Sequence, residues 1–360
     1  MAAQRRSVDD LLHGESSQIS NRSSSTELEA CVHPVWREKV IRWYFSIVSA
    51  LNRQQQQAQG GPFNRTSVHV TAGLLDRYLL ALPLELALRY KHDRAAYQLL
   101  ATSCLLIGMR LTQYDQQRSQ VPSESEDRSG DDHPTCQLKH TKTYRDHMDQ
   151  ADHQEGDVAD KAGEPSRPTA EVPPLAVSTT MAVIPTAATI LEMSAAPKTI
   201  SESKILAMVR EVTGSRAFPR SHVITALDYI RALSSSSVPE NNVVTLAPDV
   251  AEEAYRLADV SLLDATLIGC RPSVVAAASI ALAMFRSHHG SDDMLSLRQN
   301  VCSTMFGEEP EFQVAVRKVE AKIIAVAHQA TRAHAHAPRQ MHLNHLVHHS
   351  TAHLIPLEEE

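Results

Sequence analysis

Hydrophobic residues in the segment 67–82 recur at the spacing of an α-helix on nearly every side. One face carries apolar side chains along its whole length, namely Val68, Ala72, Leu75, Leu79 and Leu82. This pattern predicts a buried helix, for which Asn64, Thr66 and Ser67 offer N-cap side chains. A charged pair, Asp76-Arg77, interrupts the pattern. Because charged groups are rarely buried without a partner, Asp76 needs a cation from elsewhere in the chain.

A second amphipathic helix is predicted from Val35 to about Leu51. Its apolar positions are Trp36, Val40, Trp43, Ile47 and Leu51. Arg37 lies within this helix and is the best cationic partner for Asp76. The sequence therefore predicts a buried ion pair that joins the two helices. The alternative is an ordinary helical pair in which Asp76 is solvated at one edge.

Helical periodicity returns in later parts of the chain. The predicted segments are 93–114, 200–214, 221–233, 248–263 and 271–285, followed by a helix with Val316, Val319, Ile323 and Ala327. Ser201 can cap the second of these segments, with Ile200 and Ile205 as a hydrophobic staple. Residues 271–285 are apolar on every side but too few to span a bilayer, so we expect a central buried helix. The aromatic content of only 4% also favours helices over sheets, and an all-α fold is predicted.

Three regions lack this pattern and are expected to be disordered: residues 1–30, 116–198 and 331–360. The stretch 172–191 is uncharged but rich in proline, serine and threonine, so it predicts an extended linker and not a membrane span. The last region contains seven histidines, which could chelate zinc or copper weakly. A polar low-complexity tail is the better interpretation, and no metal site or cofactor is predicted.

Composition excludes several classes of function. The net charge of −7 gives no reason to expect binding to a phosphate backbone. The five cysteines are scattered without a C-x-x-C pair, which suits free thiols in a reducing compartment. The amino-terminal residues do not read as a secretory signal. Phosphate-binding loops, nucleophile elbows, H-E-x-x-H and kinase signatures are all missing, so the sequence does not indicate an enzyme.

Two helices carry a resemblance to a known family. The run Trp36-Arg-Glu-Lys-Val-Ile-Arg-Trp43 followed by Leu74-Leu-Asp-Arg-Tyr-Leu79 resembles the first cyclin box, in which an arginine pairs with the aspartate of an L-D-R-F/Y-L helix. The run from Leu99 to Arg110 and the Pro272-Ser273 start of the apolar segment resemble later parts of cyclins, nearest to the D type. The resemblance implies two tandem five-helix bundles. The expected boundaries are 31–115 plus 199–215 for the first box and 216–330 for the second.

The resemblance implies a regulatory subunit, not an enzyme, that binds and activates a cyclin-dependent kinase at a G1/S-like step, in nucleus and cytoplasm. The residues expected to contact the kinase are Met109, Arg110, Leu111, Ile205, Met208 and Val209. A substrate-docking patch is expected at Trp36, Val40 and Trp43. Arg110 and Val209 depart from the family, which usually has lysine and glutamate there. The alternative is therefore a cyclin-fold adaptor that does not activate a kinase.

A short apolar motif near the amino terminus has two interpretations. Leu11 and Glu15 fit the L-x-C-x-E motif by which D-type cyclins bind retinoblastoma-like pocket proteins, but His13 stands where the cysteine should be. The other interpretation, which we prefer, is a short frayed helix in a polar tail, because short motifs arise easily by chance. A pocket protein thus remains a second expected partner.

Overall fold

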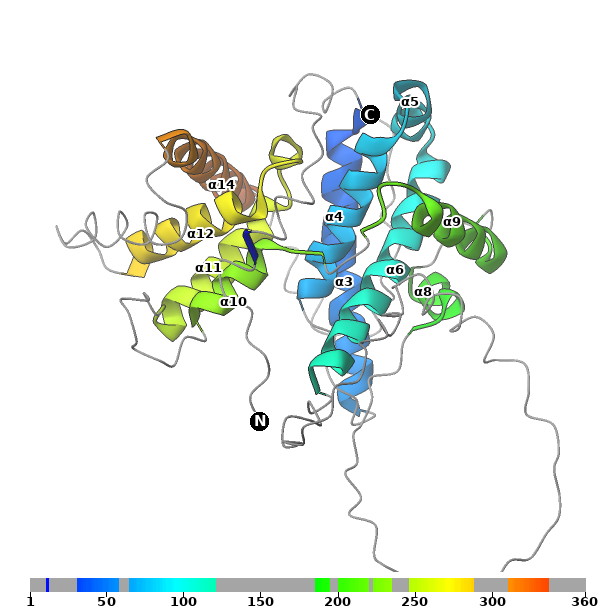
Figure 1. Ribbon diagram of the computed structural model, residues 1–360, viewed down its shortest axis with the longest axis horizontal. Helices are drawn as coiled ribbons and strands as arrows, with labels where there is room; N and C mark the ends of the chain where they lie inside the picture. Colours follow the sequence, from blue (N-terminus) through cyan, green and yellow to red (C-terminus); the bar gives the residue numbers. More distant parts are fainter. Residues whose placement is uncertain are drawn as a thin grey trace, which may run out of the picture.

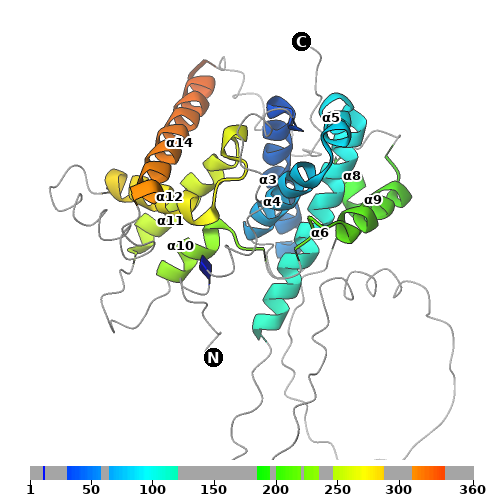
Figure 2. The same cartoon turned by 45° about the horizontal axis from the view of Figure 1, so that its top comes forward.

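The computed structural model describes residues 11–12, 31–57, 65–120, 185–194, 200–219, 223–234, 246–287 and 310–336. Within these ranges the chain forms ten α-helices, one short 3-10 helix and no strand, so the predicted all-α fold is confirmed. The helices bury two separate hydrophobic cores. Figures 1 and 2 show the corresponding two bundles side by side. None of the described helices is long and apolar enough to cross a membrane.

The first bundle is built around one helix that is buried on all sides. Its elements are α3 (Pro34–Gln57), α4 (Thr66–Ala81), α5 (Leu84–His92), α6 (Arg94–Gln120), α8 (Ala187–Ser194) and α9 (Glu202–Gly214). Every residue of α6 from Leu100 to Met109 is buried, because α4, α5 and α9 all pack against it. Ser201 caps α9 as predicted, accepting a hydrogen bond from the Lys204 amide (3.4 Å).

The second bundle has an alanine-rich helix at its centre. It consists of α10 (Ala226–Ser234), α11 (Pro248–Ser261), the 3-10 helix η1 (Ala265–Leu267), α12 (Pro272–Ser287) and α14 (Pro310–His336). As predicted, α12 is the buried element, and α10, α11 and α14 pack around it. Small alanine side chains let the neighbouring helices approach closely. Leu11, far away in the sequence, is also part of this core.

Three expectations about local structure were wrong. The helix α5 was not predicted, since its nine residues give little periodic signal. The helix α8 lies at the end of the segment expected to be a linker, and it buries Ala187 and Ile190 in the first core. The helix α4 begins at Thr66 without a cap from the side chain of Thr66 or Ser67, two of the expected caps. Asn64, the third, lies outside the described residues. In addition, α6 continues to Gln120 and α14 to His336, into regions that were expected to be disordered. Most of the expected insertion, at 121–184, lies outside the described residues.

Candidate partner-binding surface

A buried ion pair joins the first two helices of the first bundle. The Arg37 guanidinium donates from Nε to Asp76 Oδ1 (2.9 Å) and from Nη2 to Asp76 Oδ2 (2.7 Å). Burial by itself lowers the pKa of Arg37, but the Asp76 carboxylate outweighs this effect and the pKa is raised. The third nitrogen, Nη1, donates to the carbonyl oxygen of Leu262, just after α11. Arg37 therefore ties α3, α4 and the second bundle together, and the ion pair expected from the sequence is present.

The polar groups beside this pair are held in their neutral forms. Tyr97 and Cys104 are both buried, and burial together with the nearby Asp76 carboxylate raises the pKa of each. Tyr44, also buried, donates to the carbonyl oxygen of Ala101 (2.9 Å). A protonated, inaccessible thiol is a poor nucleophile. The groups around Arg37 therefore hold the helices together and do not form a reactive centre.

Most residues expected to contact a kinase are interior. The side chains of Met109, Leu111, Ile205 and Val209 are at most 4% exposed and belong to the first core. This corrects the sequence interpretation, which placed them on a binding face. Only Arg110 and Met208 of the expected set are partly exposed.

The surface beside Met208 is formed mainly by α9. Its exposed side chains in this helix are Glu202, Ser203, Lys204, Ala207, Arg210 and Glu211. Glu211 accepts a hydrogen bond from the Tyr78 hydroxyl (2.6 Å), which fixes its carboxylate against α4. Met208 receives a weak contact from the Tyr90 hydroxyl (3.9 Å to sulfur). This face is charged, solvent-accessible and held by tyrosines from two other helices.

Only one of the three residues expected to form a substrate-docking patch is partly exposed. Val40 and Trp43 are 6% and 3% exposed and pack in the first core, so they do not form a surface. Trp36 alone is half-buried, and its ring stacks on that of His33 (4.5 Å between centroids, 10° between planes). The helix faces the core with these positions because they share the stripe of Ile47 and Leu51.

The amino-terminal motif does not present its leucine to a partner. Leu11 is 1% exposed and packs into the second core. A pocket-protein motif needs this side chain free, so the structure contradicts that interpretation at Leu11. It also contradicts the expected frayed tail at this point. His13 and Glu15 lie outside the described residues.

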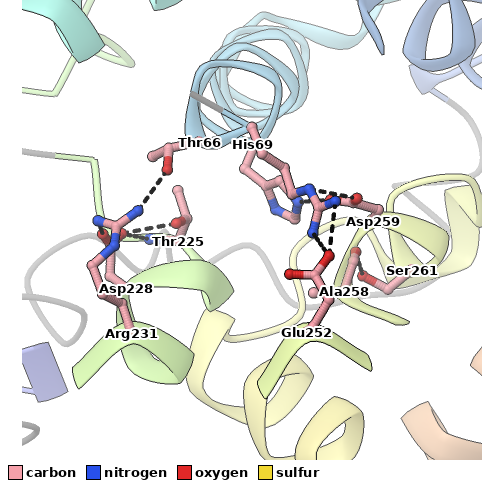
Figure 3. Close-up of polar contacts among 10 residues, drawn as sticks. Thr66, His69, Thr225, Asp228, Arg231, Glu252, Ala258, Asp259 and Ser261 are labelled. Carbon is pink, nitrogen blue, oxygen red and sulfur yellow. Dashed lines mark hydrogen bonds and ion pairs between the residues drawn. The ribbon is translucent and has the colours of Figure 1, made fainter. Parts of the chain in front are cut away.

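Polar contacts between the bundles were not foreseen from the sequence. Figure 3 shows Thr66 and His69 of α4 facing side chains of α10 and α11. His69 pairs with Asp259 (2.9 Å), and Thr66 accepts a hydrogen bond from Arg231 (2.9 Å). The partners are separated by 190 and 165 residues. A single sequence holds no signal for contacts at such separations.

No group of three metal-ligating side chains is found among the described residues. The histidines from position 342 onward lie outside them, so the chelation alternative for the tail stays a prediction.

Residues 224–349 match the family model described as Cyclin, C-terminal domain. The match covers about a third of the chain and contains α10, α11, α12 and α14. No curated protein matches the chain. The resemblance seen in the sequence rests chiefly on α3 and α4 of the first bundle, so the match in the second bundle is separate support for a cyclin-type regulatory protein.

Proposed function

We propose that this chain is the regulatory subunit of a cyclin-dependent protein kinase, acting at a G1/S-like step of the cell cycle, with a D-type pair of cyclin boxes, in nucleus and cytoplasm. The observation that carries the proposal is the bidentate Arg37–Asp76 pair between α3 and α4, in a chain whose other bundle matches a cyclin domain.

The mechanism of such a subunit is mechanical. A kinase is active only when a lysine and a glutamate in its small lobe form an ion pair, and this requires the glutamate-bearing helix to be held inward. A rigid bundle surface can supply that support. The half-buried Arg110 and Met208, with the exposed Glu202 and Lys204 at the start of α9, are the described residues best placed to make the contact.

The test uses the full chain and a panel of purified cyclin-dependent kinase catalytic subunits. We expect one of them to co-purify with the chain and to gain phosphorylation activity. Arg110→Glu and Met208→Glu should each weaken that binding by roughly tenfold or more, as expected for contacts central to an interface. Arg317→Glu, an exposed charge reversal on α14, is the matched control and should change nothing. Failure of every kinase to bind the folded chain would refute the proposal.

One observation favours the alternative of an adaptor that binds without activating. Activating cyclins usually have a glutamate facing the kinase where this chain has Val209, and Val209 is buried. Glu211, the nearby acid, is engaged by Tyr78. A bound kinase whose activity does not rise, in the same assay, would select the adaptor.

A further inference from the structure

The first turn of α4 is held by the second bundle. This helix begins without a side-chain cap, yet Thr66 and His69 each contact a side chain of α10 or α11 (Figure 3). Arg65, the residue just before the helix, contacts α11 as well. The amino-terminal end of a helix carries partial positive charge, and acidic groups near it are stabilising. Two acidic residues of α11, Glu252 and Asp259, face this end of α4.

Asp259 of α11 is the centre of these contacts. One carboxylate oxygen pairs with His69 Nε2 (2.9 Å) and the other with Arg65 Nε (3.1 Å). An ionised carboxylate can only accept hydrogen bonds, so His69 carries its proton on Nε2. The side chains of His69 and Asp259 are 4% and 18% exposed, which protects this contact from water and salt.

The other polar contacts between side chains of the two bundles are weaker. Arg65 reaches Glu252 at 3.5 Å, but the Glu252 side chain is 71% exposed, and such surface pairs contribute little. Arg231 donates to Thr66 and also lies 3.4 Å from Asp228. Asp228 is mainly engaged within its own bundle, by the amide and hydroxyl of Thr225 (2.8 Å each). Among these side-chain contacts between the bundles, those of Asp259 are therefore the strongest.

Asp259 lies near the end of α11, close to a second contact between this helix and the first bundle. Leu262, three residues later, accepts the hydrogen bond from Arg37 through its carbonyl oxygen. The last turn of α11 is thereby fixed to the first bundle at two points, one on α4 and one on α3. Glu253 of the same helix differs, because its ion pairs with Arg256 and Arg286 stay within the second bundle.

We propose that Asp259 is the positioning residue that sets the orientation of the second bundle on the first, through His69 of α4 and Arg65 just before that helix. It acts on a partner only indirectly. A kinase that touched both bundles would meet a preformed surface, and this consequence rests on the proposed function. The positioning role itself does not.

The decisive measurement is made on the full chain alone. Spin labels on exposed Ser46 of α3 and Arg317 of α14, attached through genetically encoded azido side chains, report the distribution of distances between the bundles. Asp259→Asn should broaden or shift this distribution, because loss of hydrogen bonds to a charged group favours reoriented molecules by roughly tenfold. Glu253→Gln is the matched control and should leave the distribution unchanged.

Two further variants show whether the effect depends on the Asp259 carboxylate and its partner Arg65. Arg65→Gln removes one partner of Asp259 from a side chain that is 36% exposed, so the fold should survive, and it should broaden the distribution to a smaller degree. Asp259→Glu should restore part of the native distribution, since the carboxylate remains. An unchanged distribution in Asp259→Asn, or in Arg65→Gln if the former does not fold, would overturn the proposal.

Kinase binding then separates the two proposals. If a kinase binds the native chain, Asp259→Asn should reduce its affinity while Glu253→Gln does not. If no kinase binds but the distance distribution responds as described, the positioning role stands and the proposed function fails.

Discussion

Gly108 of α6 lies directly against Thr71 of α4. A Cβ atom at position 108 would come within 3.1 Å of the Thr71 Cα and Cβ atoms, and closer still to its hydroxyl. The hydroxyl is itself fixed, because it donates to the carbonyl oxygen of Ser67 (2.6 Å). Backbone atoms cannot move aside as a flexible side chain can. The crossing of α4 and α6 therefore requires a glycine at this point.

Gly108→Ala should lower the free energy of unfolding by about 1–3 kcal/mol, the usual cost of overpacking a core. Gly73→Ala in α4 is the matched control. There an added Cβ would lie 4.0 Å from Val223 Cγ1, an ordinary contact, so alanine should raise stability by about 0.5–1 kcal/mol through helix propensity. Urea denaturation followed by circular dichroism measures both. Effects of the same sign would contradict the geometry.

Arg37→Ala should cost about 3–5 kcal/mol of stability, because it leaves the Asp76 carboxylate buried without its partner. Arg37→Lys should also be costly, since one ammonium group cannot reproduce the bidentate contact. The control is Arg42→Ala on the same helix, whose exposed pair with Glu38 (2.8 Å) should be worth about 0.5 kcal/mol or less. Similar losses in Arg37→Ala and Arg42→Ala would show that the buried pair is not critical. The measurement is again chemical denaturation.

The cap of α3 should make stability depend on pH. His33 Nδ1 accepts the amide N–H of Trp36 (3.3 Å), and partial burial, with the charge of Lys91, lowers the pKa of His33. A protonated Nδ1 cannot accept this bond. Because the pKa is lower in the folded chain, the stabilisation is full above the unfolded value of about 6.5 and is lost as pH falls through the folded value.

His33→Asn tests this directly, since asparagine is a good N-cap that does not titrate. The native chain and the variant should differ in unfolding free energy, and this difference should change between neutral pH and pH 5. The change should not exceed the contribution of an N-cap, about 0.5–2 kcal/mol. The other histidines are the same in both proteins, so their contributions to the pH dependence cancel in this difference. A constant difference across this range would count against the cap.

Leu11→Ala should destabilise the second bundle by about 2–5 kcal/mol, as for other large-to-small changes in a core. Leu12 is only partly buried, and Leu12→Ala should cost less. Hydrogen exchange of α10 and α12 reports the effect locally. Unaltered exchange in Leu11→Ala would mean that this side chain does not hold the core.

The sequence predicted the helices with long, regular periods and the pair between Arg37 and Asp76. That pair was predictable because Asp76 interrupts an apolar helix and needs a cation, and because the two helices together resemble the first cyclin box. The short α5 and α8 give only two turns of signal, and α8 follows a proline-rich stretch. Their helical state depends on packing against α6 and α9, which no local pattern encodes.

The candidate site was harder to predict, for a different reason. The resemblance assigned roles to positions along α6 and α9 without regard to which faces those helices bury. Because the middle of α6 is apolar on nearly every side, its periodicity could not show that Met109 points into the core. The contact of His69 with Asp259 depends on how two bundles meet, which is a property of the whole molecule.

The hydrogen bond from Arg37 to the Leu262 carbonyl oxygen limits how this protein can be divided into fragments. A fragment that stops at Pro219 would retain Asp76 but lose the Leu262 carbonyl acceptor, and the uncapped first turn of α4 would face water. A fragment that begins at Val223 would lack Leu11. Neither half is therefore expected to behave as an autonomous folding unit, and truncation studies should keep both together.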